Sequence, residues 1–233
     1  MSSREGFREF LRERGLAHDD ATLARYFGYL DRLLETNETT NLTAVRDADE
    51  AVARHLEDSL ELTTELAGIA SGRVIDLGTG GGLPGVPLAI ARPDLSFVPV
   101  DAREKKIAFV DAAARSVGLT NVQAVAARAE SLGAVGSPFR ESAIAVVSRA
   151  LAPLPVLLEL AIPLVRNSGV LLAVKGERWP DEVEASRRAM QVLSVSLEST
   201  RRTRTGTILV LRKNAATPAR YPRAPGEPKR KPL

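Results

Sequence analysis

The sequence contains no cysteine among its 233 residues and only two histidines, His18 and His55. The lack of cysteine excludes a thiolate nucleophile, a Cys-based zinc site and redox switching, and it fits a reducing compartment. Neither histidine lies in a cluster of ligand residues, so we expect no metal. The sequence also lacks a run of about 18 apolar residues and an apolar N-terminal signal. Together these absences predict a cytoplasmic protein that does not bind membranes.

Charge is distributed unevenly, although the net charge is only +3. Residues 201–233 carry ten Lys and Arg and a single acid, Glu227. Such a segment is typical of a protein that binds a polyanion, because cations that neutralise phosphates release counterions. The alternative is a solvated tail, and charge alone does not separate the two.

The chain divides into three predicted segments. Residues 1–70 are predicted to form a helical segment, because apolar residues recur at three- and four-residue spacing. Asp19 and Asp20 are the N-cap candidates of its second helix, and Asp47 begins a further helix. Residues 71–213 alternate between short apolar strands and helices, which predicts a mostly parallel sheet with crossover helices. Residues 214–233 are rich in Pro and Arg; we expect them to lie on the surface without a packed core.

The predicted sheet has seven strands. Five alternate with helices near 84–91, 104–117, 152–166 and 180–191, and they are expected at 74–77, 97–100, 122–125, 144–147 and 170–174. Two more, at 193–198 and 207–211, follow one another without a helix between them, which predicts an antiparallel hairpin at one edge.

The first strand runs into a glycine loop that suggests a cofactor site. Gly80, Gly82 and Gly85 satisfy the motif G-x-G-x-x-G. Asp101 ends the second strand about 20 residues further along the chain, the sequence separation at which nucleotide-binding sites carry the acid that binds the ribose. The pattern alone is also compatible with an NAD-binding loop, or with a tight turn that binds no ligand. Asp76, however, precedes the glycines and would repel a pyrophosphate. The same acid suits S-adenosylmethionine, which has no phosphate and carries a sulfonium and an amino group.

Five motifs, spread over nearly the whole chain, resemble those of one family. They are Asn41-Leu42-Thr43-Ala44-Val45, His55-Leu56-Glu57-Asp58-Ser59-Leu60, Asp76-Leu77-Gly78-Thr79-Gly80-Gly81-Gly82-Leu83-Pro84-Gly85-Val86-Pro87, Val147-Ser148-Arg149-Ala150 and Val174-Lys175-Gly176. With them the sequence resembles the GidB/RsmG family of bacterial methyltransferases. The resemblance implies a Rossmann-like S-adenosylmethionine-dependent methyltransferase fold with an N-terminal helical extension. It also implies N7-methylation of a guanine in the 530 loop of 16S rRNA (guanine 527 in customary rRNA numbering), with 16S rRNA or the small ribosomal subunit as partner. We expect a monomer.

The resemblance also assigns roles to residues in the cofactor site. Asp101 matches the acid that accepts hydrogen bonds from the ribose hydroxyls, and Ala129 and Glu130 match the pair that borders the adenine. The expected cofactor-binding set is Asp76, Gly78, Gly80, Leu83, Asp101, Ala129, Glu130 and Arg149.

Arg149 is the candidate catalytic residue. Guanine N7 has a free lone pair and no proton, so direct attack on the methyl group needs no general base, and positioning supplies most of the catalysis. Arg149 follows the fourth strand, at the edge of the sheet where ligands bind, and there it can hold a phosphate, a base or the cofactor carboxylate. The alternative is a surface salt bridge.

Two groups of residues are candidates for RNA contact. His55 and Asp58 lie one helical turn apart and face the same side, although a helical histidine is often structural. The tail combines cations with one stackable ring, Tyr221, and its RNA-binding candidates are Arg220, Arg223, Lys229, Arg230 and Lys231. Removing residues 214–233 is therefore predicted to weaken RNA binding and to leave cofactor affinity nearly unchanged.

Two other functions remain open from the residues. One is a methyltransferase that acts on another RNA or a small molecule, and the other is a noncatalytic nucleotide- or RNA-binding protein. Asp76, Asp101 and Arg149 argue against the second.

Overall fold

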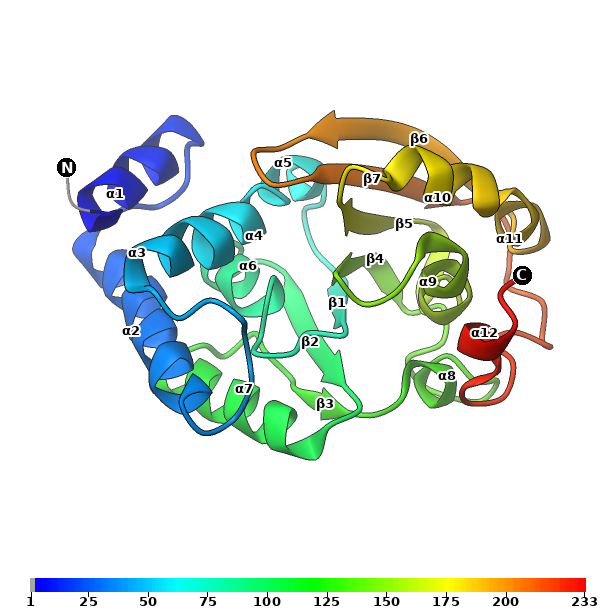
Figure 1. Ribbon diagram of the computed structural model, residues 1–233, viewed down its shortest axis with the longest axis horizontal. Coiled ribbons are helices and arrows are strands. Elements are labelled where there is room, and N and C mark those ends of the chain that lie inside the picture. Colours follow the sequence, from blue (N-terminus) through cyan, green and yellow to red (C-terminus); the bar gives the residue numbers. More distant parts are fainter. Residues whose placement is uncertain (1–2) are drawn as a thin grey trace.

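A seven-stranded sheet with helices on both faces forms the centre of the computed structural model, which describes residues 3–233 (Figure 1). The strands are β1 (Arg73–Leu77), β2 (Ser96–Asp101), β3 (Val125–Ala126), β4 (Ala143–Arg149), β5 (Val165–Lys175), β6 (Val195–Arg202) and β7 (Thr207–Lys213). They lie in the order β3-β2-β1-β4-β5-β7-β6. The pairs from β3 to β5 are parallel, whereas β7 runs antiparallel to both β5 and β6. The predicted sheet and its antiparallel edge hairpin are confirmed.

Six short helical elements precede the sheet. They are α1 (Ser3–Glu13), α2 (Asp20–Asn37), α3 (Ala48–Ala51), the π-helix η1 (Val52–Glu57), α4 (Asp58–Leu60) and α5 (Thr63–Leu66). Asp19 caps α2 by accepting from the Thr22 N–H, and Asp47 caps α3 by accepting from the Glu50 N–H, as predicted. The π-turn inside the third predicted helix was not anticipated.

The remaining helices connect the strands or follow them. They are α6 (Gly85–Ala91), α7 (Glu104–Ser116), α8 (Ala129–Leu132), α9 (Leu154–Ala161), α10 (Trp179–Ala185), α11 (Arg187–Val192) and α12 (Glu227–Arg230). The N-terminal helices lie on the same side as α6 and α7, and α8 to α12 lie on the other (Figure 1).

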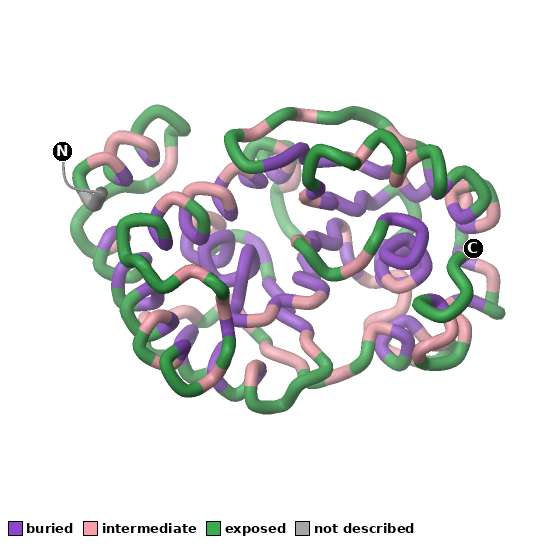
Figure 2. Tube along the Cα trace, viewed as in Figure 1, coloured by how far each residue is buried: buried purple, intermediate pink, exposed green. Residues whose placement is uncertain are grey.

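The inner strands of the sheet are mostly buried between these layers, whereas the edge strand β6 and the outer helices and loops are largely exposed (Figure 2). Phe7, Tyr26 and Leu33 share a hydrophobic cluster with Val86 of α6 and Phe109 of α7. The N-terminal helices therefore complete the core that covers one face of the sheet. The division of the chain at residues 70 and 213 stays a prediction.

Several element boundaries differ from the predictions, and the helix predicted at 180–191 is divided into α10 and α11. Helix α9 ends at Ala161, not at 166, because Val165 already pairs with Ala143 in the sheet. The third strand is only Val125–Ala126, and Val122 makes an isolated bridge to Phe97. A short apolar run is compatible with the end of a helix or with a strand, so the hydrogen bonds to neighbouring strands decide which of the two forms.

The C-terminal tail packs against the domain, which corrects the expectation that it has no part in a core. Tyr221 is 7% exposed and belongs to the cluster that covers the second face of the sheet. The Arg140 guanidinium donates to the carbonyls of Tyr221, at 2.8 Å, and Thr217, at 2.9 Å. These long-range hydrogen bonds satisfy the irregular backbone, and the sequence pattern carries no signal for them.

Within residues 3–233, none of the helices combines the length and the apolar character needed to cross a lipid bilayer.

Candidate active site

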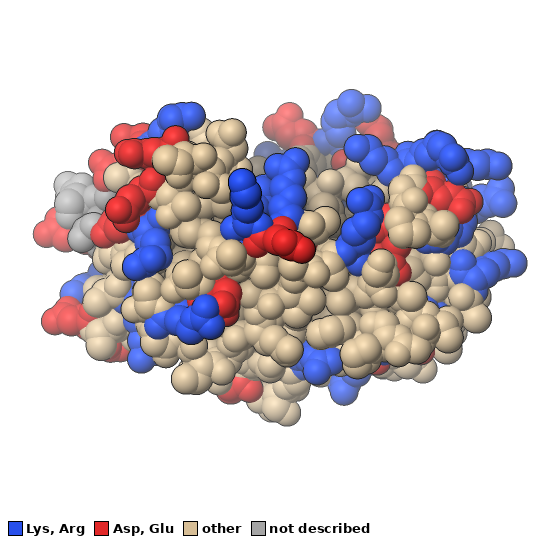
Figure 3. Space-filling model, turned by 90° about the horizontal axis from the view of Figure 1, so that it is seen from below, with Lys and Arg blue, Asp and Glu red and all other residues tan. Residues whose placement is uncertain are grey.

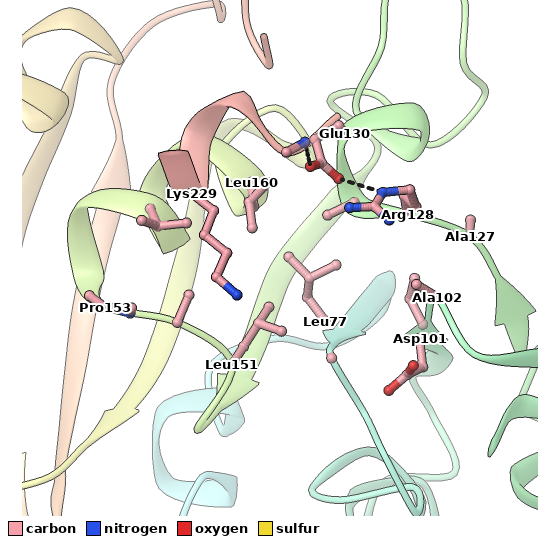
Figure 4. Close-up of a pocket in the computed structure, with 16 residues that line it drawn as sticks. Leu77, Asp101, Ala102, Ala127, Arg128, Glu130, Leu151, Pro153, Leu160 and Lys229 are labelled. Atoms are coloured by element: carbon pink, nitrogen blue, oxygen red, sulfur yellow. Dashed lines mark hydrogen bonds and ion pairs between the residues drawn. The ribbon is translucent and has the colours of Figure 1, made fainter. Parts of the chain in front are cut away.

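Two adjoining cavities lie at the carboxyl ends of the parallel strands, the edge where open α/β sheets bind ligands. The first has a volume of about 340 Å³. Its wall comes from the ends of β1 and β2, from residues 127–130 after β3, from the loop after β4, from α9 and from the C-terminal tail (Figure 4). The second has a volume of about 650 Å³ and shares Leu151, Ala152 and Pro153 with the first.

The glycine loop brings backbone to the edge of the first cavity. Gly78 has a φ of +80°, and a Cβ there would lie 2.6 Å from Leu151 Cδ1. Only glycine combines this backbone conformation with such close packing. Asp101 ties the loop to β2, because its carboxylate accepts from the N–H groups of Gly80, at 3.2 Å, and Arg103, at 2.9 Å.

Asp76 lies beneath the loop and is fully buried. Its Oδ2 accepts from the Thr79 hydroxyl and, at 2.9 Å, from the Gly85 N–H. Its Oδ1 has no hydrogen-bond partner among the described residues. Burial raises the pKa of Asp76 to about 6, although the two hydrogen bonds oppose the change. Asp76 thus anchors the loop and leaves a buried, incompletely satisfied anion next to the cavity.

Four of the predicted cofactor residues line the first cavity: Gly78, Asp101, Ala129 and Glu130. Asp76, Gly80 and Leu83 are not part of its wall, and Leu83 instead packs in the N-terminal cluster. Asp76 holds the loop through its hydrogen bonds, whereas Gly80 and Leu83 are parts of the loop that do not face the cavity. The Glu130 carboxylate accepts from the Gly226 N–H at 2.8 Å, so it holds the C-terminal tail. The predicted set therefore contains both wall residues and supports.

This donor set fits S-adenosylmethionine. The Asp101 carboxylate can accept from ribose hydroxyls, and the apolar side chains of Leu77, Leu151 and Leu160 offer surface for a purine. The buried negative charge of Asp76 favours a ligand with cationic groups over one with a pyrophosphate.

The second cavity gathers charged residues from distant parts of the chain. His55 and Asp58, predicted to face the same side, line it together with Arg149. Lys175 and Glu182 join them, with Lys175 Nζ donating to Glu182 Oε2 at 2.7 Å. Sequence reasoning did not assign these two, although Lys175 lies in one of the family motifs.

Arg149 is held by the backbone of the π-turn. Its Nη1 donates to the carbonyl oxygen of Arg54 at 2.8 Å. In this turn the Asp58 N–H bonds to Ala53 and not to Arg54, as a π-turn requires. Burial lowers the pKa of Arg149, and Asp58 opposes that change. Within residues 3–233 no carboxylate pairs directly with this guanidinium, so the surface salt bridge considered as its alternative role is absent.

His55 is a buried, neutral member of the second cavity. The Thr43 hydroxyl accepts from the Val45 N–H and lies 2.7 Å from His55 Nε2. Nε2 and the Thr43 hydroxyl therefore form a hydrogen bond, whereas Nδ1 is buried without a partner among the described residues. Burial, and to a lesser extent Arg149, lowers the pKa of His55 to about 4. The imidazole thus orients the segment near Thr43 and carries no charge at pH 7.

Known proteins are similar to this chain in sequence and in fold. The family GidB, described as rRNA small subunit methyltransferase G, matches residues 23–210. The chain belongs to this family. A ribosomal RNA small subunit methyltransferase G from Sorangium cellulosum is 42% identical over 94% of this chain and 91% of that protein. The protein of the same name from Deinococcus radiodurans is also 42% identical, over 97% and 92%.

Solved structures agree with the GidB fold assignment. A putative O-methyltransferase from Klebsiella pneumoniae superposes with a TM-score of 0.57 at 16% identity, over 80% of this chain and 90% of that one. A putative S-adenosyl-L-methionine-dependent methyltransferase from Methanococcus maripaludis gives 0.57 at 14%, over 80% and 92%. The predictions of a Rossmann-like methyltransferase fold, of GidB membership and of an S-adenosylmethionine-dependent enzyme are confirmed.

Proposed function

We propose that this GidB protein transfers a methyl group from S-adenosylmethionine to N7 of a guanine in the 530 loop of 16S rRNA. The observation that carries the proposal is the pair of cavities with a common wall at residues 151–153. One cavity has the donor set for the cofactor, and the other is lined by cations and acids that suit a nucleic-acid base. Because these shared residues place the two cavities side by side, ligands in the two cavities can meet for direct transfer of a methyl group.

The chemistry needs orientation more than proton transfer. When bound, the cofactor supplies an activated methyl group, and guanine N7 attacks it without losing a proton. The protein therefore has to align the base and exclude water, and this alignment can lower the barrier by several kcal/mol. Arg149 suits this task, since its guanidinium is fixed at one end by Arg54 and lines the base cavity.

The second cavity has the polarity that guanine requires. Guanine presents an acceptor, O6, beside donors at N1 and N2. Arg149 and Lys175 can donate to O6, and Asp58 and Glu182 can accept from the donor edge. Burial raises the pKa of Asp58, while Thr205 and Arg149 oppose that change. Adenine lacks this combination, so the cavity favours guanine.

Cationic side chains extend away from the cavities. Lys and Arg concentrate on the half of the face in Figure 3 that carries the C-terminal elements, whereas the other half mixes both signs. Six of the ten cations after residue 200 form ion pairs, which the sequence did not indicate: Arg201, Arg202, Arg204, Arg212, Lys213 and Arg223. The other four are Arg220, Lys229, Arg230 and Lys231.

Arg223 does not support its predicted role in RNA binding. Its guanidinium bonds to both carboxylate oxygens of Glu159, which is fully buried, at 2.8 and 2.5 Å. We retain Arg220, Arg230 and Lys231 as proposed phosphate contacts. We further propose that the protein works in the cytoplasm, where its ribosomal substrate is found, and that it works as a monomer.

The test is methylation of small ribosomal subunits from cells that lack this modification. Purified protein and radiolabelled S-adenosylmethionine are added, and N7-methylguanine is mapped by chain cleavage at the modified base. We expect one modified guanine in the 530 loop. Arg149→Ala should abolish transfer and leave cofactor affinity within about threefold, since Arg149 lines only the second cavity, where we place the base, and not the first. Label at another nucleotide, or full activity of the variant, contradicts the proposal.

A further inference from the structure

The C-terminal segment is fixed directly against the cofactor cavity. Arg223 clamps it to Glu159 of α9, and its backbone N–H also donates to Glu159 Oε1 at 2.9 Å. Three residues later, the Gly226 N–H donates to Glu130, on the opposite side of the same cavity. Helix α12 therefore spans from α9 to α8 and closes one side of the cavity. This segment lies beyond residues 23–210, the part of the chain that the family matches.

Lys229 is the one charged side chain that α12 contributes to the cavity wall. Figure 4 shows its stem passing Leu160 and its amino group pointing into the cavity, toward Leu77 and Leu151. No hydrogen bond or ion pair with another described residue engages this ammonium. Arg230 and Lys231, next in sequence, do not line the cavity. A cation without a partner at the wall of a ligand cavity implies an acceptor on the ligand.

We propose that Lys229 is a cofactor-binding residue that donates a hydrogen bond to the adenosine half of the cofactor. The inference deepens the proposed use of S-adenosylmethionine at this site. Acceptors on this half are the ring nitrogens of adenine and the ribose oxygens. On the other half the only acceptor is the carboxylate, which the ammonium and the sulfonium outweigh, so that half carries a net positive charge. Glu130, expected to border the adenine, is engaged with Gly226, so the tail contributes a donor where Glu130 is occupied.

Lys229 thereby moves from the predicted RNA-binding set to the cofactor site. The same geometry corrects the prediction that removal of residues 214–233 spares cofactor affinity, because the removed segment forms part of the cavity wall. Truncation is nevertheless a poor test. Tyr221 and Thr217 are buried, so their removal destabilises the whole domain.

A sharper test compares Lys229→Met with Lys231→Met in the full chain. Both residues are exposed and lie two residues apart, so neither change should affect folding. Calorimetric titration measures the Kd of each variant for S-adenosylmethionine and for 5′-methylthioadenosine, which lacks the amino-acid half. For Lys229→Met we expect about tenfold weaker binding of both ligands, the lower end of the effect of losing one charge-assisted hydrogen bond. Lys231→Met should bind both as tightly as the unsubstituted protein does.

The outcomes separate this inference from the proposed function. Unchanged binding by Lys229→Met overturns the inference, as does a loss confined to S-adenosylmethionine, which would place the contact at the amino-acid carboxylate. If the unsubstituted protein binds neither ligand, both the inference and the proposed cofactor are refuted. If the binding pattern holds and no rRNA is methylated, only the proposed acceptor is wrong.

Discussion

Replacing Asp76 by Asn is expected to stabilise the ligand-free fold at neutral pH and to weaken cofactor binding. Asp76 is fully buried and has no ion-pair partner within residues 3–233, so its ionised form destabilises the fold. Asn has nearly the same shape, and its carbonyl oxygen can accept the bonds that Thr79 and Gly85 now donate. The substitution therefore removes the charge and keeps the loop.

The size of the effect follows from the pKa. A rise from 3.8 to about 6 corresponds to a cost of about 3 kcal/mol for the carboxylate above pH 7. The Asn amide places two donors where Oδ1 has no partner, which costs about 1–2 kcal/mol. We therefore expect Asp76→Asn to raise the free energy of unfolding by about 1–2 kcal/mol at pH 7.5.

The pH dependence gives a sharper readout. Between the unfolded and folded pKa values the native state binds more protons than the unfolded state, so this group's contribution to stability falls as pH rises from about 4 to 6 and is constant above that. Urea unfolding at several pH values measures both proteins, and the other carboxylates cancel in the difference. The advantage of the variant should grow by about 3 kcal/mol across this window.

Cofactor affinity should change in the opposite direction. For a separation of about 10 Å and an effective dielectric constant of about 20, an anion contributes about 1.7 kcal/mol to binding of a cationic ligand, so the Kd should rise about 10–20-fold. A stability difference that stays constant with pH would show that Asp76 is not the buried charge described above. Unchanged affinity would show that its charge does not reach the ligand.

Three further predictions concern other parts of the site. The pKa of His55 lies near 4, below its unfolded value, so the neutral imidazole's contribution to stability is lost as pH falls through about 6.5 toward 4. In urea unfolding at several pH values, His55→Gln should lack that loss. If the free energies of unfolding of the variant and the unsubstituted protein fall in parallel with pH, His55 is not the buried neutral group described above. Gly78→Ala should weaken S-adenosylmethionine binding more than tenfold, because it adds both strain and a clash in the cavity wall. Gly118→Ala is its control, since Gly118 also has a positive φ but has open space around it, and equal affinities of the two variants would count against the clash. Arg223→Ala should lower the free energy of unfolding by about 3 kcal/mol by leaving the Glu159 carboxylate buried without its partner, while replacement of both residues by Met should cost much less. A double variant as unstable as the single one would contradict that explanation.

The sequence predicts the sheet and the glycine loop because both depend on local patterns. Alternating apolar segments predicted the seven strands and the antiparallel edge hairpin, and Asp19 and Asp47 cap helices through bonds to residues three positions away. Gly78 follows β1 and Asp101 ends the adjacent strand β2, so both residues line the first cavity.

The features that were missed depend on contacts between distant residues. The tail looks disordered by composition, yet Arg140 and Glu159, far away in sequence, supply the partners that order it. Likewise the partnership of Lys175 with Glu182 and the hold of Arg149 on the π-turn exist only after the chain has folded. Lys175 and Glu182 are seven residues apart, but the other pairs are too far apart in sequence for one local window to contain both members.

Leu151 lines both cavities, and its position has a consequence for inhibitor design. Its side chain packs against Gly78 on the cofactor side and also lines the base cavity. A compound that joins adenosine to a purine through a short linker could displace this side chain and occupy both cavities at once. Such a molecule should bind far more tightly than adenosine alone, because the second group attaches without a second loss of translational freedom. Selectivity would then come from the acceptor half, since the adenosine half resembles that of every enzyme that uses the same methyl donor.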